Sequence, residues 1–276
     1  MFQPVIKWSG SKRSQANEII KHFPKEINTY LEPFCGGASV LRALIESDIK
    51  VNSYICSDVN QDLINLWNEI KLNPIGISEV YKMRWHELND KDDNKERKKR
   101  YFEYVRELYN KEHKPYDFFF ILRTCFNGLI RYNENGQFNS PYHLNRNGIK
   151  PEKIKSILLE WSKLLIDNDV KFFHSDYKQI CPDIKDFMYL DPPYSATKGM
   201  YKGNFNRNDF FKWLSDKDCK WVLSYDGISG NVNNTFDVPE NLYDEHVYIK
   251  SRNSSFKRLK ESDKNAVVFE SLYVKK

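Results

Sequence analysis

Near its start the chain passes from a strand-like segment through a pair of glycines into a helix. Residues 29–34 are predicted to form the strand and residues 35–37, Cys-Gly-Gly, the turn, while apolar side chains recur at helical spacing over residues 38–45. Residues 51–56 have the composition of the next strand. A strand, a glycine-rich turn, a helix and a second strand in this order predict a parallel α/β sheet.

The middle of the chain has a different pattern. Apolar side chains recur at helical spacing over residues 77–88, 101–108 and 154–165, whereas residues 118–125 are compatible with either a helix or a strand. The turn signal Asn-Glu-Asn-Gly at residues 133–136 predicts a hairpin.

Strand-like segments return later in the chain, at residues 170–173, 187–190, 221–225, 245–249 and 267–274. The simplest interpretation is an α/β catalytic domain built from residues 1–73 and 161–276. A mostly helical insert, residues 74–160, would divide it.

Composition limits the function classes. Lys and Arg number 43 against 38 Asp and Glu, and the net charge of +5 suits a polyanionic partner without requiring one. The five cysteines include no Cys-x-x-Cys pair and the six histidines show no ligand spacing, so we expect neither disulfides nor a metal. The N-terminus has no apolar signal region and no run approaches about eighteen apolar residues, so we expect a cytoplasmic protein without a membrane partner.

The strongest chemical signal is Asp191-Pro192-Pro193-Tyr194, which directly follows the apolar residues 187–190. In a parallel sheet, ligands bind at the carboxyl ends of the strands. The prolines fix their φ angles and remove two N–H donors, so the loop offers a carboxylate, carbonyl oxygens and an aromatic ring. A proline-rich turn that carries Tyr194 as a surface aromatic is the structural alternative.

Adenine N6 is an amine that such a loop could hold. It is a poor nucleophile because its lone pair is conjugated with the ring. Acceptors at Asp191 and at the Pro192 carbonyl could draw the nitrogen toward a tetrahedral arrangement, while Tyr194 holds the face of the base. The base must leave the duplex to reach them, so base flipping is implied.

Residues 32–37, Glu-Pro-Phe-Cys-Gly-Gly, and Asp58 form a second signal. Glycines at a strand-to-helix turn let a ligand approach the backbone closely, although a tight turn alone is an open alternative. The pattern is neither the dinucleotide-binding Gly-x-Gly-x-x-Gly nor a Walker A loop. Asp58 ends the next strand, where an acidic side chain commonly binds ribose hydroxyls, but it could also cap the following helix.

Three motifs carry a resemblance, in the order Lys7-Trp8-Ser9-Gly10-Ser11-Lys12, Glu32-Pro33-Phe34-Cys35-Gly36-Gly37 and Asp191-Pro192-Pro193-Tyr194. Over nearly the whole chain, this set resembles the Dam-type DNA adenine-N6 methyltransferases of the D12 class, whose recognition region lies between the cofactor motif and the catalytic motif. The resemblance implies a class I S-adenosylmethionine-dependent methyltransferase fold, Rossmann-like with a mostly parallel sheet. It also implies that residues 74–160 form the target-recognition domain.

The resemblance further implies roles for single residues. The catalytic group is Asp191, Pro192 and Tyr194. The residues that match cofactor contacts are Trp8, Lys12, Glu32, Phe34, Gly36, Asp58, Asp176, Tyr177 and Asp191, of which Asp58 matches the ribose-binding acid. Ser9 and Ser11 stand where many relatives have Ala and Gly, and we expect little effect because Ser is small. Glu32 stands where Asp is common, which leaves its contact open.

Residues 126–133, Phe-Asn-Gly-Leu-Ile-Arg-Tyr-Asn, resemble the DNA-contacting hairpin of the family. Arg131 could hold a phosphate or read guanine, and Asn133 could read adenine. Phe126, with Asn127 beside it, could wedge into the base stack. Alternatively, Phe126 and Ile130 are core residues and Arg131 is a solvated charge.

A basic run precedes this hairpin and comprises Lys95, Arg97, Lys98, Lys99 and Arg100. It is either a solvated helix face or a phosphate contact, which a salt-dependent DNA affinity would reveal.

We therefore expect a direct in-line displacement in which N6 of adenine in duplex DNA attacks the methyl carbon of S-adenosylmethionine and S-adenosylhomocysteine leaves. The alternatives are methylation of another amino group (cytosine N4, RNA adenine or a protein amide) and a DNA-binding regulator that has lost catalysis. From the resemblance to Dam, GATC is the first candidate target. We expect a monomer or a weak dimer of bacterial or phage origin, and a cognate restriction endonuclease is an open partner.

Overall fold

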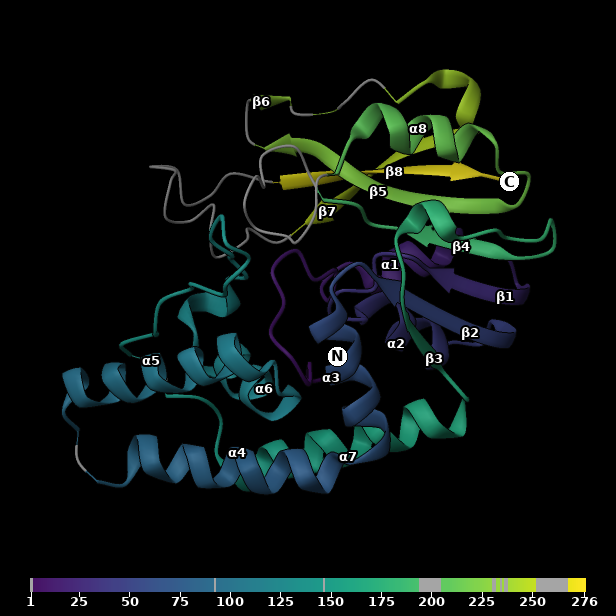
Figure 1. Cartoon of the computed structure of the whole chain (residues 1–276). Coiled ribbons are helices and arrows are strands. Elements are labelled where there is room, and N and C mark those ends of the chain that lie inside the picture. The colour runs from purple at the N-terminus through teal and green to yellow at the C-terminus, as the bar shows by residue number, and fades with distance from the viewer. Residues whose placement is uncertain are drawn as a thin grey trace. The chain divides into compact units, whose positions relative to one another are not determined.

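The computed structural model describes residues 2–91, 93–145, 147–193, 205–229, 232–233, 235, 238–251 and 268–276 (Figure 1). Its strands are β1 (Glu26–Glu32), β2 (Lys50–Asp58), β3 (Lys171–His174), β4 (Phe187–Leu190), β5 (Lys220–Ser229), β6 (Val232–Asn233), β7 (Glu245–Ser251) and β8 (Val268–Lys275). Its helices are α1 (Ala16–Ile19), α2 (Ser39–Ile45), α3 (Gln61–Leu72), α4 (Pro74–Asn89), α5 (Lys95–Glu112), α6 (Pro115–Thr124), α7 (Pro151–Asp167) and α8 (Arg207–Ser215).

The chain folds into two compact units. One, the helical unit, contains Met1–Ser9 and Asn60–Phe172. The other, the sheet unit, contains Gly10–Val59 and most of the chain from Phe173 onward. The first nine residues thus belong with the helical unit, whereas the predicted catalytic domain includes them. How recognition and catalysis divide between the units stays a prediction.

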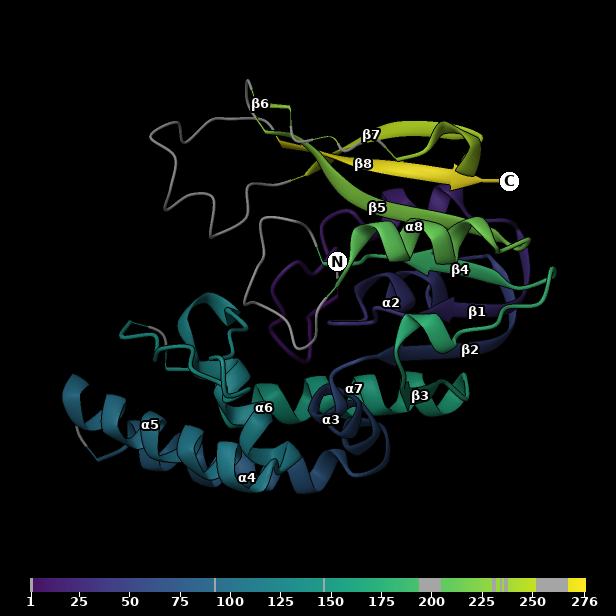
Figure 2. The ribbon, with the colours of Figure 1, turned by 45° about the horizontal axis from the view of Figure 1, so that its top comes forward.

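The strands follow the order β3-β2-β1-β4-β5-β8-β7, and β6 pairs with the end of β5 (Figure 2). β1 runs parallel to both β2 and β4, and β4 runs parallel to β5. β8 is antiparallel to both of its neighbours, β5 and β7. A mostly parallel sheet in which β8 and the short β6 run antiparallel to β5 confirms the predicted Rossmann-like methyltransferase fold class.

The burial of β4 explains why the bounds of this short strand could be predicted from the sequence. All of its residues are buried, and it lies between β1 and β5 in the sheet. Strands that are covered on both faces have continuous apolar sequences rather than alternating ones. The run Phe-Met-Tyr-Leu is such a sequence, and the predicted bounds 187–190 are those observed.

In the helical unit, the segment that the sequence left open between helix and strand, residues 118–125, lies almost entirely in the helix α6. α4 packs against α7, and α5 packs against α6 (Figures 1 and 2). The side chains of residues 118–122 in α6 are fully buried. A helix that is surrounded on all sides is apolar all round, so its sequence carries no 3.6-residue period to separate it from a strand. In the part of the chain that the structure describes, no helix combines the length and apolarity needed to span a bilayer.

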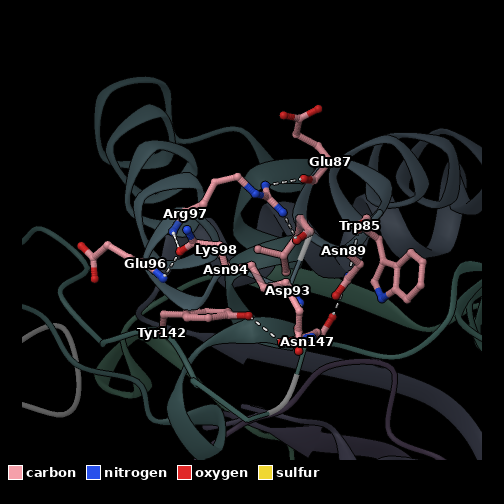
Figure 3. A network of polar contacts seen from close by, with 11 residues as sticks. Trp85, Glu87, Asn89, Asp93, Asn94, Glu96, Arg97, Lys98, Tyr142 and Asn147 are labelled. Carbon is pink, nitrogen blue, oxygen red and sulfur yellow. Dashed lines mark hydrogen bonds and ion pairs between the residues drawn. The ribbon is translucent and has the colours of Figure 1, made fainter. Parts of the chain in front are cut away.

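Two members of the basic run have structural roles (Figure 3). Arg97 donates hydrogen bonds to the main-chain oxygens of Glu87 and Leu88, at 2.9 and 3.0 Å, near the end of α4. Lys98 is buried and pairs with Asp93 at 2.7 Å. A cation at a helix C-terminus stabilises carbonyls that have no partner within the helix. Phosphate contact stays a prediction for Lys95, Lys99 and Arg100.

The same corner of the helical unit holds the irregular segment before α7. Asn89 donates to the main-chain oxygen of Asn147 at 3.3 Å, and the Tyr142 hydroxyl donates to the Asn147 side chain at 2.7 Å (Figure 3). The Tyr81 hydroxyl bonds both the N–H and the carbonyl of Ile149, at 3.0 and 2.7 Å. Side chains of helical residues thus satisfy main-chain groups that regular secondary structure would otherwise pair.

Candidate active site

The carboxyl ends of β1, β2 and β4 lie at one edge of the sheet. In the parallel register, Leu31 of β1 lies opposite Ile55 of β2 and Met188 of β4. Asp58 ends β2 and Asp191 follows β4, so both carboxylates and the turn after β1 lie at the edge where parallel sheets bind ligands. The structure therefore brings together predicted residues from three separate parts of the sequence.

A buried ammonium group joins the first motif to the catalytic motif. Lys12 Nζ lies 2.8 Å from Asp191 Oδ1, 3.7 Å from Glu270 Oε2 on β8, and donates to the Gly10 carbonyl at 3.1 Å. The Lys12 side chain is 5% exposed, against 18% for Asp191 and 21% for Glu270. A charge this deeply buried requires ionic and hydrogen-bonding partners, so Lys12 orients the Asp191 carboxylate at the end of β4.

Asp58 closes the glycine turn. Its Oδ2 accepts a hydrogen bond from the Gly36 N–H at 3.2 Å, and its main-chain oxygen accepts from the Ser175 N–H at 3.2 Å. Gly36 has a φ of 43°, in the left-handed region that glycine tolerates best. The alternative that Asp58 caps α3 is wrong, because the capping side chain is that of Asn60, which accepts from the second and third N–H groups of the helix.

An aromatic cluster flanks this turn in the sheet unit. The ring of Phe34 lies 5.5 Å from that of Tyr177 and 6.2 Å from that of Phe205, and Tyr177 also contacts Phe210 and Trp213. The Tyr177 hydroxyl is buried and has no hydrogen-bond partner among the described residues. Asp176 caps the short turn that carries Tyr177, because its side chain accepts from the Lys178 N–H at 2.9 Å.

These residues suit the chemistry of S-adenosylmethionine. The carboxylate of Asp58 ends the second strand, where such a group binds ribose hydroxyls, and the rings of Phe34 and Tyr177 offer apolar faces to a purine. The hydroxyl of Tyr177, which the described part of the chain leaves without a partner, is a further polar group that a ligand could satisfy. Direct contact of each residue with the cofactor stays a prediction.

Glu32 is buried rather than open to solvent. It is 3% exposed, and its Oε2 accepts a hydrogen bond from the Tyr30 hydroxyl at 2.9 Å. The pKa of the Glu32 carboxyl is raised to about 8, mainly by burial. The negative charges of Asp191 and Asp58 contribute to this rise, and the hydrogen bonds from Tyr30 and from the Leu41 main chain oppose it. Near neutral pH this carboxyl is therefore mostly protonated. Whether Glu32 contacts the cofactor stays a prediction.

Replacing Glu32 with glutamine is expected to change how stability depends on pH. Because burial holds the pKa of Glu32 at about 8 in the folded chain against 4.5 in the unfolded one, the folded state binds the extra proton between these values. Wild-type stability therefore falls as pH rises from 4.5 to 8, by about 1.4 kcal/mol per pH unit from this group. The neutral variant lacks this loss, so denaturation at pH 5 to 8 should show E32Q gaining stability relative to wild type as pH rises.

The control for this series is Glu26→Gln, at the exposed start of the same strand. It should follow the wild-type curve at every pH. If the stability of E32Q and of wild type changed in parallel between pH 5 and 8, Glu32 would be ionised in the folded chain over that range, contrary to the prediction.

The predicted DNA-contacting hairpin is present in the helical unit. Tyr132 and Phe138 form an antiparallel bridge, and the Asn133 N–H donates to the Gln137 carbonyl at 2.9 Å. The side-chain oxygen of Asn133 accepts from the N–H groups of Asn135 and Gln137, which shapes the tip of the hairpin. The predicted hairpin is therefore confirmed, and its contact with DNA stays a prediction.

The other hairpin residues occupy different environments. Ile130 is fully buried, so the core alternative is right for it. Arg131 is exposed, but its guanidinium donates to the side chain and main chain of Asn139 at 2.7 and 2.9 Å, so it is not simply solvated. Phe126 is half-buried and stacks on His143 with a centroid distance of 5.2 Å, while Asn127 has a φ of 52°.

The positions of two predicted residues, Trp8 and Tyr194, relative to the carboxyl ends of β1, β2 and β4 stay a prediction. Trp8 is half-buried and belongs to the helical unit. Tyr194 lies outside the described residues, whereas Asp191 and Pro192 lie inside them. Tyr30 was not predicted from the sequence, although its position two residues before Glu32 places both on one face of β1. Glu270 could not be predicted, because no local signal marks it.

Comparison with known proteins shows which family the chain belongs to. Residues 8–267 match the family described as D12 class N6 adenine-specific DNA methyltransferase. The type II methyltransferase M.MjaIII of Methanocaldococcus jannaschii is 30% identical over 250 residues, which cover 80% of this chain and 83% of that protein. A DNA adenine methylase of Haemophilus influenzae is 30% identical over 201 residues, or 70% of this chain and 64% of that protein. The chain therefore belongs to the D12 class of N6 adenine-specific DNA methyltransferases.

Proposed function

We propose that the chain methylates N6 of an adenine flipped out of duplex DNA, with Asp191 and the Pro192 carbonyl as acceptors for the reacting amine. The observation that carries this assignment is the position of Asp191. It directly follows the buried strand β4 and pairs with Lys12 at 2.8 Å. The acceptor thus lies directly after a rigid strand, at the edge of the sheet where ligands bind.

The protein's part in the reaction is to position and polarise the amine. An acceptor placed at hydrogen-bond distance draws the N–H groups of adenine away from the ring plane and makes the nitrogen lone pair available. A preorganised acceptor of this kind needs no reorganisation during the reaction. The two prolines after Asp191 limit the freedom of the loop that carries it. Tyr194 is proposed to hold the face of the base.

S-adenosylmethionine supplies an activated methyl group when it is bound. The residues proposed to hold it are Trp8, Lys12, Glu32, Phe34, Gly36, Asp58, Asp176, Tyr177 and Asp191. Among these, Asp58 would bind the ribose hydroxyls, and Phe34 and Tyr177 would face the purine. No metal ion enters this proposal, because transfer from a sulfonium is already downhill.

The DNA is proposed to contact the hairpin through Phe126, Asn127, Arg131 and Asn133. Relatives are named as type II methyltransferases and as DNA adenine methylases. A cognate restriction endonuclease is proposed as a partner to test. GATC is the first target to test.

One experiment tests the whole proposal. The full chain is expressed in a host that lacks DNA methylation, and its genomic DNA is sequenced with single-molecule detection of modified bases. N6-methyladenine at one short sequence is the expected result. A parallel assay with tritiated S-adenosylmethionine compares duplex DNA, RNA and protein as acceptors. Label in cytosine N4, RNA or protein, with none in adenine of DNA, would overturn the proposal.

A further inference from the structure

The N-terminal segment that carries Trp8 is attached to the helical unit by main-chain hydrogen bonds. The Trp161 indole N–H donates to the Gln3 carbonyl at 2.9 Å. The buried Arg123 guanidinium donates to the carbonyls of Pro4 and Val5, at 3.1 and 3.4 Å. The N-terminal path, residues 2–9, is therefore bound to α6 and α7 at residues 3–5, and the chain enters the sheet unit at Gly10.

Ser9 ends this path with two hydrogen bonds to the predicted DNA-contacting segment. Its hydroxyl donates to the Gly128 carbonyl at 3.1 Å and accepts from the Ile130 N–H at 3.0 Å. One side chain thus satisfies the main-chain groups on both sides of Leu129. An alanine at this position has neither the donor nor the acceptor and could make neither bond, so the small effect expected of Ser9 stays a prediction to be tested.

Gly128 provides a second and independent close contact between the same two segments. Its φ is +69°, and a Cβ placed on it would lie 2.7 Å from Lys7 Cβ. Such a separation is too short for two carbon atoms, so the segment approaches the N-terminal path as closely as it does because residue 128 has no side chain.

Gly128 and Ile130, the two residues that Ser9 bonds, lie between the predicted DNA contacts. Phe126 and Asn127 precede Gly128, and Arg131 follows Ile130 directly. On the other side, Ser9 follows Trp8 in the predicted cofactor motif. The Ser9 hydroxyl therefore connects two segments that the proposed function assigns to different ligands.

We propose that Ser9 is a positioning residue that couples the binding of duplex DNA to the binding of the methyl donor. This inference rests on the proposed function, because it requires that Trp8 serves the donor and that residues 126–131 serve DNA. When DNA holds the segment at Gly128 and Ile130 in place, the two hydrogen bonds hold residues 7–9 in place as well. A residue that acts this way raises the affinity for each ligand in the presence of the other, by the same factor.

The test measures that factor on the full chain. The probe is a labelled duplex that carries the target sequence identified by the methylation experiment. Its dissociation constant is measured by fluorescence anisotropy, with and without saturating S-adenosylhomocysteine. Calorimetry gives the reciprocal measurement, the affinity for S-adenosylhomocysteine with and without the duplex. We expect a factor of at least about 5 in the wild type. In Ser9→Ala it should fall below about 2, while each ligand alone binds within about threefold of wild type.

Ser140→Ala is the matched control. The buried Ser140 hydroxyl donates to the Leu129 carbonyl at 2.7 Å. It therefore stabilises the same segment, residues 128–130, but does not connect that segment to the N-terminal residues. This variant should keep the wild-type factor. A wild-type factor near 1, an unchanged factor in Ser9→Ala, or an equal loss in Ser140→Ala would each overturn the inference. The proposed function is judged separately, by whether the wild type methylates adenine in DNA.

Discussion

Asp191→Ala is expected to lower the rate of adenine methylation by about 10³-fold while the affinity for DNA stays within about threefold of wild type. The substitution removes a preorganised acceptor from the end of β4, and the loss of one such group costs about 10²–10³-fold in turnover. It also deprives Lys12 of its nearest carboxylate, 2.8 Å away. The hairpin proposed to contact DNA belongs to the helical unit and keeps its contacts. Single-turnover methylation and anisotropy give the two quantities.

Asp186→Ala serves as the matched variant for this experiment. Asp186 directly precedes β4 and accepts a hydrogen bond from Asn28 at 3.2 Å, so it carries the same charge at the opposite end of the strand. Its turnover should remain within about twofold of wild type. Near-normal turnover in Asp191→Ala would refute the role assigned to that carboxylate, whatever its effect on DNA affinity.

Lys12→Met is the second substitution with a large expected effect. It removes the ammonium group that lies between Asp191 and Glu270 and leaves both carboxylates without it, in a site where Lys12 itself is 5% exposed. Breaking a buried ion pair by removing one partner costs about 3–5 kcal/mol. Because both carboxylates retain some exposure, we expect a loss of about 3 kcal/mol in the free energy of unfolding, together with a fall in turnover of at least about 100-fold.

Lys50→Met provides the comparison for an exposed pair. Lys50 lies 3.1 Å from Glu26, and both side chains are mostly exposed. Removing one partner of a surface pair changes stability by about 1 kcal/mol or less. Denaturant unfolding of the two variants should therefore separate clearly. A loss of less than about 1 kcal/mol in Lys12→Met would mean that Asp191 and Glu270 do not depend on that ammonium group.

Much of the sheet could be predicted because its signals are local. β4 was predicted at its observed bounds, since a central strand is apolar throughout, and the turn after β1 was marked by Gly36 and Gly37. α6 could not be distinguished from a strand, because a helix buried on every side shows no period. Asp58 and Asn60 are two residues apart, and only the geometry of α3 shows that the second is the cap.

The sequence alone determined the fold class, the family and the group of residues at the carboxyl ends of β1, β2 and β4, because strand-end motifs in a parallel sheet always meet at one edge. Only the tertiary structure showed that Glu270 approaches Lys12, that Tyr30 bonds the buried Glu32, and that the Ser9 hydroxyl is bound to Gly128 and Ile130. The Lys12 and Ser9 contacts join residues far apart in the chain, and the burial of Glu32 depends on the whole sheet around it. A local sequence pattern indicates which kind of group a residue can bind, but packing between distant segments determines which partner the residue has.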